Sequence, residues 1–224
     1  MFFLYEEYEK KCLESRWDYF LATLVELDEN LEVTFPSNIN FISWNYDNQV
    51  NIAFNEFCNK EEYQKVKPEL VHLNGNCDFV YYNDSKIHSH NLGYGSIFKL
   101  VFEDFFKKFQ ESLRLTKLGD AIYPTLKFAW ETKIEENSRL VRAKELLSNS
   151  DVIVVIGYSF PIYNRKIDGY LLQGLDWEDK EIVIQVGKSF PNVKSKILGL
   201  LGDVIPPKIS EENQKETFYI PSNF

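Results

Sequence analysis

The stretch that decides the fold is Asp151–Asn164, which reads D-V-I-V-V-I-G-Y-S-F-P-I-Y-N. Its five apolar residues, Val152–Ile156, run directly into Gly157. A short β-branched run that ends at glycine is typical of a strand buried on both faces, and such strands belong to parallel sheets covered by helices. Ligands of these sheets bind beyond the carboxyl ends of the strands.

Four residues at the end of this strand suit a ligand-binding turn: Gly157, Tyr158, Ser159 and Asn164. Glycine lets the backbone approach a ligand closely, and a serine hydroxyl both donates and accepts hydrogen bonds. Turn residues look alike whether or not a ligand is present, so this stretch alone fits an ordinary strand-to-helix connection equally well.

The composition points to a globular protein and excludes two classes of partner. The chain has 224 residues, 44% of them hydrophobic and 16% aromatic, which is enough for one sizeable α/β domain or two small ones. Its net charge of −9 argues against a general nucleic-acid surface, which needs a basic stripe, and against docking on an anionic membrane.

Cysteines and termini point to the cytoplasm. Cys12, Cys58 and Cys77 are too few and too scattered for a disulfide framework, and no C-x-x-C pair indicates a zinc site. The amino-terminal residues lack the basic start and long apolar core of a signal peptide, and we find no run of about twenty apolar residues that would span a bilayer.

Hydrophobic periodicity predicts an alternation of strands and helices. The expected strands are 39–44, 70–73, 152–156 and 181–186, with a hairpin arm at 78–82 and an edge strand at 217–220. The expected helices are 3–28, a segment after Asp47, 97–113, 136–148, 165–175 and 191–201, and 84–95 is expected to be a polar loop. This order predicts a Rossmann-like parallel sheet with helices on both faces. We expect one domain over 1–224, with a leading helix in 1–30 and a helical insertion in 84–150.

Three polar tips follow three of the expected strands: Asn45-Tyr46-Asp47, Asn74-Gly75-Asn76 and Gly157-Tyr158-Ser159. In a parallel sheet all three lie at the same edge, which forms a binding crevice. Asp47 also suits the N-cap of the next helix, because its carboxylate accepts hydrogen bonds from free backbone N–H groups.

Taken together and in this order, the tips resemble those of the sirtuin-like NAD-processing family. In that family one strand ends in N-x-D, as in Asn45-Tyr46-Asp47, a second in L-H-G, as in Leu73-Asn74-Gly75, and a later one in G-x-S, as in Gly157-Tyr158-Ser159. The V-I-G-Y-S-F-P-x-Y-N stretch is similar to the zinc-free bacterial branch, whose better-known members are NAD-degrading domains in anti-phage defence. The resemblance covers roughly residues 38–190, interrupted between 84 and 150.

The resemblance implies a sirtuin-like fold with NAD as its cofactor. Asn45 would hold the nicotinamide ribose or the attacking water, and Asp47 would shape the tip. Gly157 and Ser159 would contact the ribose or the phosphates. The remaining members of the expected nucleotide site are Asn74, Gly75, Tyr158 and Asn164.

Two departures from the family weaken the case for catalysis. The family's catalytic histidine corresponds here to Asn74, which cannot take up a proton near neutral pH. His72 lies two residues earlier and would substitute only in a deeper crevice, so a histidine packed on its strand is the preferred interpretation. The family's opening strand and glycine-rich phosphate loop are not found before Met1, which implies a missing amino-terminal portion or a degenerate member.

Other catalytic patterns are weaker. His88 and His90 have no obvious third metal ligand nearby, so we expect a solvated loop and no metal site. Ser159 lacks the second glycine of a nucleophile elbow.

Two functions remain open on the sequence. One is an enzyme that cleaves NAD at the nicotinamide–ribose bond, with Asn45 and His72 as catalytic residues. The other is an inactive module that keeps the fold and binds NAD, an ADP-ribose-like nucleotide or a protein. The sequence leaves open a protein partner or a homo-oligomer.

Overall fold

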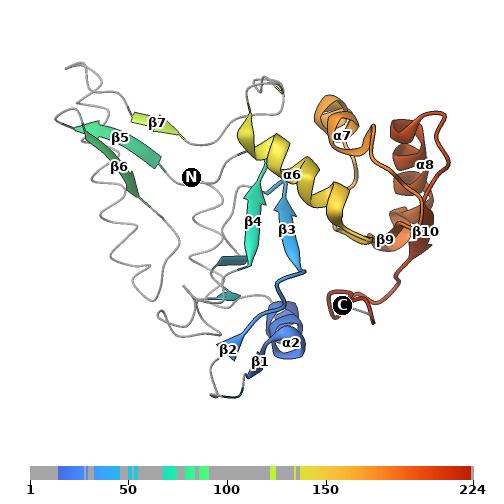
Figure 1. Ribbon diagram of the computed structural model, residues 1–224, viewed down its shortest axis with the longest axis horizontal. Coiled ribbons are helices and arrows are strands. Elements are labelled where there is room, and N and C mark those ends of the chain that lie inside the picture. Colours follow the sequence, from blue (N-terminus) through green and yellow to red (C-terminus); the bar gives the residue numbers. More distant parts are fainter. Residues whose placement is uncertain are drawn as a thin grey trace.

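The computed structural model describes residues 15–27, 29, 33–45, 50–51, 53–54, 68–74, 79–83, 86–90, 122–124, 134 and 137–222. Over these residues the chain is a mixed α/β protein that contains parallel sheets and helices (Figure 1). The coarse fold class expected from the sequence is therefore confirmed.

The carboxyl-terminal part forms a parallel sheet of three strands in the order β10-β9-β8. These strands are β8 (Val152–Ile156), β9 (Glu181–Gln185) and β10 (Lys208–Glu211). Parallel strands are joined by crossover connections, which usually contain a helix. The crossover helices here are α7 (Arg165–Leu172), after β8, and α8 (Phe190–Leu201), after β9. One 3-10 turn precedes each helix, at Ile162–Asn164 and Gly187–Ser189.

A second parallel pair consists of β3 (Asn40–Ser43) and β4 (Glu69–His72). Helix α6 (Ser138–Asn149) crosses over this pair and then leads directly into β8 (Figure 1). Asn137 begins α6, because its side chain accepts a hydrogen bond from the Arg139 backbone N–H at 3.0 Å. α7 packs between α6 and α8.

The amino-terminal part adds a helix and a small hairpin. α2 (Ser15–Leu24) is followed by β1 (Glu26–Leu27), which pairs antiparallel with β2 (Val33–Thr34). Residues 50–51 and 53–54 are helical as well. A third sheet, antiparallel and in the order β6-β5-β7, contains β5 (Phe79–Asn83), β6 (Lys86–His90) and β7 (Ile122–Pro124).

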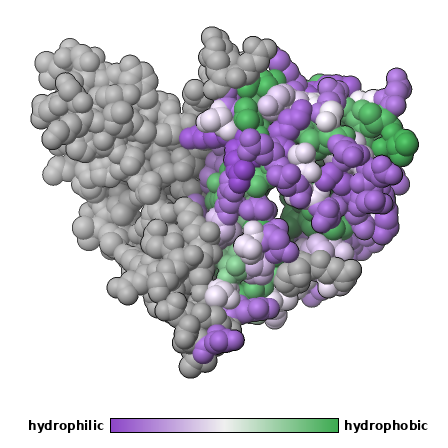
Figure 2. Space-filling view, viewed as in Figure 1, coloured by the Kyte–Doolittle hydropathy of each residue, from purple (hydrophilic) through white to green (hydrophobic). Residues whose placement is uncertain are grey.

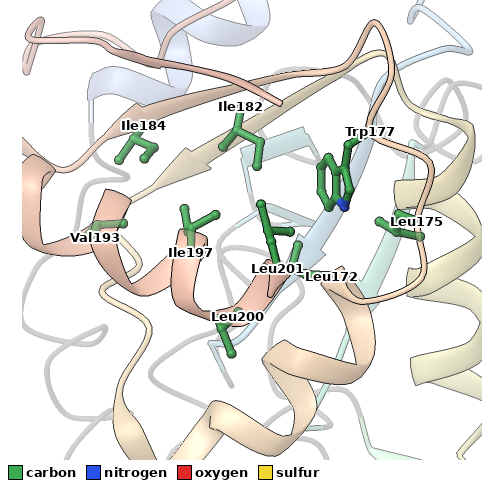
Figure 3. Packing of buried hydrophobic residues seen from close by; sticks show 9 residues of the cluster. All are labelled: Leu172, Leu175, Trp177, Ile182, Ile184, Val193, Ile197, Leu200 and Leu201. Carbon is green, nitrogen blue, oxygen red and sulfur yellow. The ribbon is translucent and has the colours of Figure 1, made fainter. Parts of the chain in front are cut away.

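Three hydrophobic clusters hold these elements together. The largest fills the space between the β8–β10 sheet, α7 and α8, around Ile184 and Ile197, both fully buried (Figure 3). A second, rich in aromatic rings, joins α2 to β3 through Phe20 and Phe41, whose ring centroids lie 5.9 Å apart. The third packs α6 and α7 on the other face of β3 and β4, around the fully buried Leu140.

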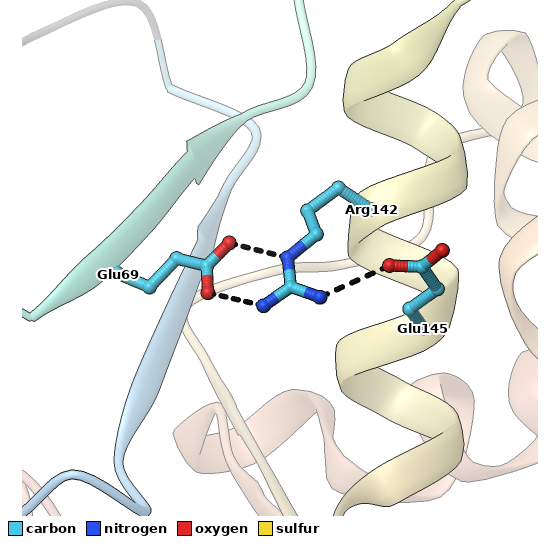
Figure 4. Close-up of polar contacts among 3 residues, drawn as sticks. All are labelled: Glu69, Arg142 and Glu145. Atoms are coloured by element: carbon cyan, nitrogen blue, oxygen red, sulfur yellow. Dashed lines mark hydrogen bonds and ion pairs between the residues drawn. The ribbon is translucent and has the colours of Figure 1, made fainter.

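An ion-pair network fixes α6 on β4 (Figure 4). Arg142 donates two hydrogen bonds of 2.6 Å to the Glu69 carboxylate and one of 3.0 Å to Glu145. These hydrogen bonds lower the pKa of Glu69. Because the Arg142 side chain is 47% exposed, we regard the network as fixing orientation rather than as a main source of stability.

Several expected elements are confirmed, and the errors lie mainly at sheet edges. Strands near 39–44, 70–73, 152–156 and 181–186 are present, as are helices near 136–148, 165–175 and 191–201. The expected single sheet is wrong for the described strands, because β3–β4 and β8–β10 form separate sheets. Val152 and Ile156 are 36% and 38% exposed, so β8 is not buried on both faces as its composition predicts.

Three local predictions also need correction. The loop expected at 84–95 contains β6, which pairs with β5 in a hairpin. Residues 217–220 form no strand, and β10 is the strand that pairs with β9 instead. The leading helix is described only as α2, which ends at Leu24 rather than at residue 28, and the helix expected at 97–113 lies outside the described residues.

Candidate functional site

A cavity of about 750 Å³ lies between β3 and β8. It is lined by Asn40–Asn45 from β3 and its tip, and by Ile153–Tyr158 from β8 and its tip. The turn after β9 contributes Gly187 and Lys188. Figure 2 shows a hollow near the middle of this face of the protein. The cavity volume of about 750 Å³ is in the range of small-molecule sites.

The tips of β3 and β8 meet at one end of this cavity. The rings of Trp44 and Tyr158 stack with centroids 5.3 Å apart and planes inclined by 10°. Each ring follows the carboxyl end of its strand, so the two strands end at the same edge. Trp44, which precedes the first polar tip, thus stacks on Tyr158 of the third, whereas Tyr46 and Asp47 lie outside the described residues.

Tyr158 belongs to a partly buried hydrogen-bond network. Its hydroxyl donates to the Asp168 carboxylate, whose oxygens lie at 2.9 and 3.1 Å, and accepts a hydrogen bond of 2.9 Å from the Asn164 side-chain amide. Burial raises the pKa of the Asp168 carboxyl to about 7, and the Tyr158 hydrogen bond partly opposes this shift. Burial and the Asp168 charge both raise the pKa of the Tyr158 hydroxyl. The network therefore fixes the Tyr158 ring under Trp44.

Asn45 is exposed at the rim of the cavity. Its backbone N–H donates to the Ser43 hydroxyl at 3.1 Å, and its carbonyl oxygen lies 3.2 Å from His72 Nδ1. The contacts with Ser43 and His72 thus fix the backbone that carries the Asn45 side-chain amide. His72 is half-buried and does not line the cavity, in keeping with a packed strand histidine.

Asn74 follows the end of β4 and does not line the cavity. Its side chain is only 4% exposed. Among the described residues its Oδ1 atom has no hydrogen-bond partner. A buried amide oxygen without a partner is unfavourable by about 1–3 kcal/mol, so Asn74 is a local cost to stability at the end of β4.

The backbone of Gly157 is accessible at the rim of the cavity. Its φ of +66° is the left-handed conformation that favours glycine, and a Cβ atom placed there would meet nothing within 4 Å. Phe160, three residues later, has a positive φ of 48°, which is unusual for an aromatic residue and marks strain at this tip.

Two basic residues, Lys188 and Lys215, line the cavity near Gly187. Lys188 precedes α8, and Lys215 passes within 3.2 Å of the position that a Gly187 Cβ would occupy. In the described part of the chain neither lysine has an acidic partner. Lys196 is used differently, since its ammonium group donates to the Ser159 carbonyl at 2.7 Å.

The structure brings together some of the expected site residues and separates others. Asn45, Gly157 and Tyr158 line the cavity, and Asn164 acts on it through Tyr158. His72, Asn74 and Ser159 do not line it, and Asp47 and Gly75 lie outside the described residues. Sequence reasoning missed Trp44, Asp168 and Lys188. An acidic residue on the buried face of α7, next to Ile167 and Leu171, was the available signal for Asp168.

Two negative findings apply to the described residues. There, no group of three or more His, Cys, Asp or Glu side chains is arranged to hold a metal ion. None of the helices in those segments is long and apolar enough to cross a lipid bilayer.

Comparisons with family models, with curated proteins and with solved structures give no match to this chain.

Proposed function

We propose that this protein binds a phosphate-bearing nucleotide of the NAD or ADP-ribose kind at the carboxyl edge of β3 and β8. The observation that carries the proposal is that Asn45, Gly157 and Tyr158, from tips more than a hundred residues apart, line one cavity. This is the edge at which parallel α/β sheets bind ligands.

The chemistry of the rim supports a nucleotide. The Asn45 amide can donate to and accept from ribose hydroxyls, and Gly157 leaves room for a sugar or a phosphate to approach the backbone. Lys188 supplies a positive charge where the chain enters α8. The stacked pair of Trp44 and Tyr158 offers an apolar surface beside these polar groups.

Binding is favoured over cleavage of the nicotinamide–ribose bond. Asn74 stands where the resemblance to sirtuin-like proteins requires a histidine, and His72 does not line the cavity. Neither residue is therefore placed as the general base that the family mechanism requires. Asp168, the acidic residue among the described lining residues, accepts a hydrogen bond from the Tyr158 hydroxyl. A role in anti-phage defence is an implication of the resemblance alone.

Calorimetric titration of the whole chain with NAD, ADP-ribose and adenosine tests the proposal. Asn45→Ala should weaken binding of NAD and ADP-ribose by about fivefold to tenfold, since it removes hydrogen bonds worth about 1–1.5 kcal/mol. The exposed Asn149→Ala, at the far end of α6, is the matched control and should change nothing. Lys188→Ala should weaken ADP-ribose but not adenosine, which has no phosphate.

Two results would overturn this function. One is the absence of heat with both NAD and ADP-ribose at millimolar concentration. The other is equal binding by the Asn45→Ala and Asn149→Ala variants. Nicotinamide release is measured on the same samples, and any release that Asn45→Ala leaves unchanged excludes the Asn45 mechanism.

A further inference from the structure

The carboxyl-terminal segment Gln214–Tyr219 crosses the end of β9, and we call it the strap. It follows β10 and contains no helix or strand. The Glu212 backbone N–H still donates to the Ile184 carbonyl of β9 at 3.0 Å, and the Glu212 carboxylate accepts from the Gln214 N–H at 2.7 Å. From there on, the backbone polar groups of the strap need partners outside a sheet.

One buried side chain supplies these partners. Gln185, the last residue of β9, is only 7% exposed. Its Nε2 atom donates hydrogen bonds of 2.5 and 2.6 Å to the Gln214 and Thr217 carbonyls. Its Oε1 atom accepts a hydrogen bond of 3.0 Å from the Tyr219 N–H. Both amide protons and the oxygen of Gln185 thus hold the strap.

Phe218 anchors the strap on the amino-terminal part of the protein. Its ring is buried, and its centroid lies 4.7 Å from that of Trp17 and 5.8 Å from that of Phe20, both in edge-to-face arrangement. Since Trp17 and Phe20 belong to α2, the strap connects the β8–β10 sheet to that helix. Gln185 and the aromatic rings therefore set its position from two sides.

The strap forms part of the wall of the proposed nucleotide site. Gln214, Lys215 and Phe218 line the cavity, and so does Gln185, which holds them. A change at Gln185 can therefore alter the cavity wall through the strap, without any direct contact between Gln185 and a ligand.

Lys215 is the charged residue that the strap brings to this wall. A Cβ atom placed on Gly187 would lie 3.2 Å from Lys215 Cε and 3.6 Å from its Nζ, so the lysine side chain runs closely past the turn after β9. Lys188, in the same turn, also lines the cavity. Glu212 and Glu216, the acidic residues closest to Lys215 in sequence, lie outside the lining. An anionic group at this turn would thus meet positive charge from two segments of the chain.

We propose that Lys215 binds a phosphate of the nucleotide and that Gln185 is its positioning residue, because Gln185 holds the strap that carries Lys215 into the cavity. This role rests on the proposed function and adds to it the place of the phosphates, between the strap and the turn after β9. The amide of Gln185 is already bonded to the strap and touches no ligand in this arrangement.

Calorimetric titration of the whole chain with ADP-ribose and with adenosine tests Lys215. Lys215→Ala should weaken ADP-ribose binding by about tenfold, as expected for the loss of one charge-assisted hydrogen bond, and should leave adenosine binding unchanged. Lys215→Arg keeps the charge and should retain most of the affinity. Lys166→Ala removes the same charge from an exposed position on α7 outside the cavity and should change nothing.

A double-mutant cycle separates positioning from a general structural role. Gln185→Met keeps the size of the side chain but none of its hydrogen bonds, so it should weaken ADP-ribose binding by about threefold to fivefold. In the Lys215→Ala background the same substitution should change the affinity by less than about twofold, because Gln185 acts through Lys215. Hydrogen exchange measured by NMR on the unliganded Gln185→Met protein should show that the Tyr219 amide has lost its protection.

A second measurement needs no variant and decides the matter if Gln185→Met does not fold. Trypsin cleaves after exposed lysines, and Lys215 lies in a segment without helix or strand. ADP-ribose at ten times its Kd should slow cleavage after Lys215 by about tenfold, because only the unliganded fraction is cut. Adenosine at the same saturation should not slow it.

The outcomes distinguish this inference from the proposed function. Equal ADP-ribose affinity of the natural and Lys215→Ala proteins would overturn the role of Lys215, while a loss of affinity in Asn45→Ala would still support the nucleotide site. The same weakening by Gln185→Met in both backgrounds, or equal slowing of cleavage by adenosine, would show that the strap is only structural. No binding of ADP-ribose by the natural protein would overturn both proposals.

Discussion

Replacing Asp168 by asparagine should change how the stability of the protein depends on pH. The Asp168 side chain is 2% exposed, and burial raises its pKa from 3.8 to about 7. Between these two values the folded state holds a proton that the unfolded state has lost, so the free energy of unfolding falls as pH rises. Each pKa unit corresponds to about 1.4 kcal/mol, which gives about 4 kcal/mol over the whole range. About 3 kcal/mol of this falls between pH 5 and pH 8.

The Asp168→Asn variant keeps an oxygen that accepts the Tyr158 hydrogen bond but does not ionise. Urea denaturation of both proteins at pH 5, 6, 7 and 8 gives the free energies of unfolding. Relative to the variant, the natural protein should lose about 3 kcal/mol from pH 5 to pH 8. Asp203→Asn, at an exposed position, is the control and should give a pH-independent difference. A difference for Asp168→Asn that stays within about 0.5 kcal/mol across this range would refute a desolvated carboxyl beneath Tyr158.

Two further substitutions test the tip of β8 and the core in the same urea assay. Gly157→Ala should destabilise the protein by about 1 kcal/mol, because φ is +66° there, whereas Gly199→Ala inside α8 should stabilise it by up to about 1 kcal/mol. A Gly157→Ala protein as stable as the natural one would contradict the left-handed turn. Ile184→Ala in the fully buried centre of β9 should be destabilising by about 2–5 kcal/mol, against less than about 0.5 kcal/mol for the exposed Ile205→Ala. Equal effects at these two positions would place the core elsewhere.

The part of the fold that could be predicted from sequence is the part in which local pattern and burial agree. The stretch from β8 to α8 alternates apolar runs with amphipathic helices and has glycine at positive φ at Gly157 and Gly187. Pattern alone therefore gave these elements within a few residues of their bounds. Asn45 and Gly157 line one cavity, as expected from the carboxyl ends of parallel strands, although β3 and β8 belong to separate sheets.

The sequence did not predict β10, because contacts with neighbouring elements, rather than its own residues, make it a strand. β10 reads K-I-S-E, which has little apolar pattern, and it pairs with the buried strand β9. The apolar residues at 217–220 looked like a strand, but this segment is held by Gln185, whose side chain bonds to the backbone of Thr217 and Tyr219. The role of Asp168 could not be predicted for the same reason, since it depends on a tyrosine ten residues earlier on a different element.

The composition of β8 and its exposure in the structure do not agree. Its sequence V-I-V-V-I is that of a strand in the middle of a sheet, as apolar as β9 beside it, yet β9 is buried from Ile182 to Gln185 while β8 is exposed at both ends. Proteins avoid exposed apolar edge strands because these recruit other chains. Among the described strands β8 pairs with β9 alone, so it has the composition of an interior strand while its other edge faces the cavity that β3 also lines.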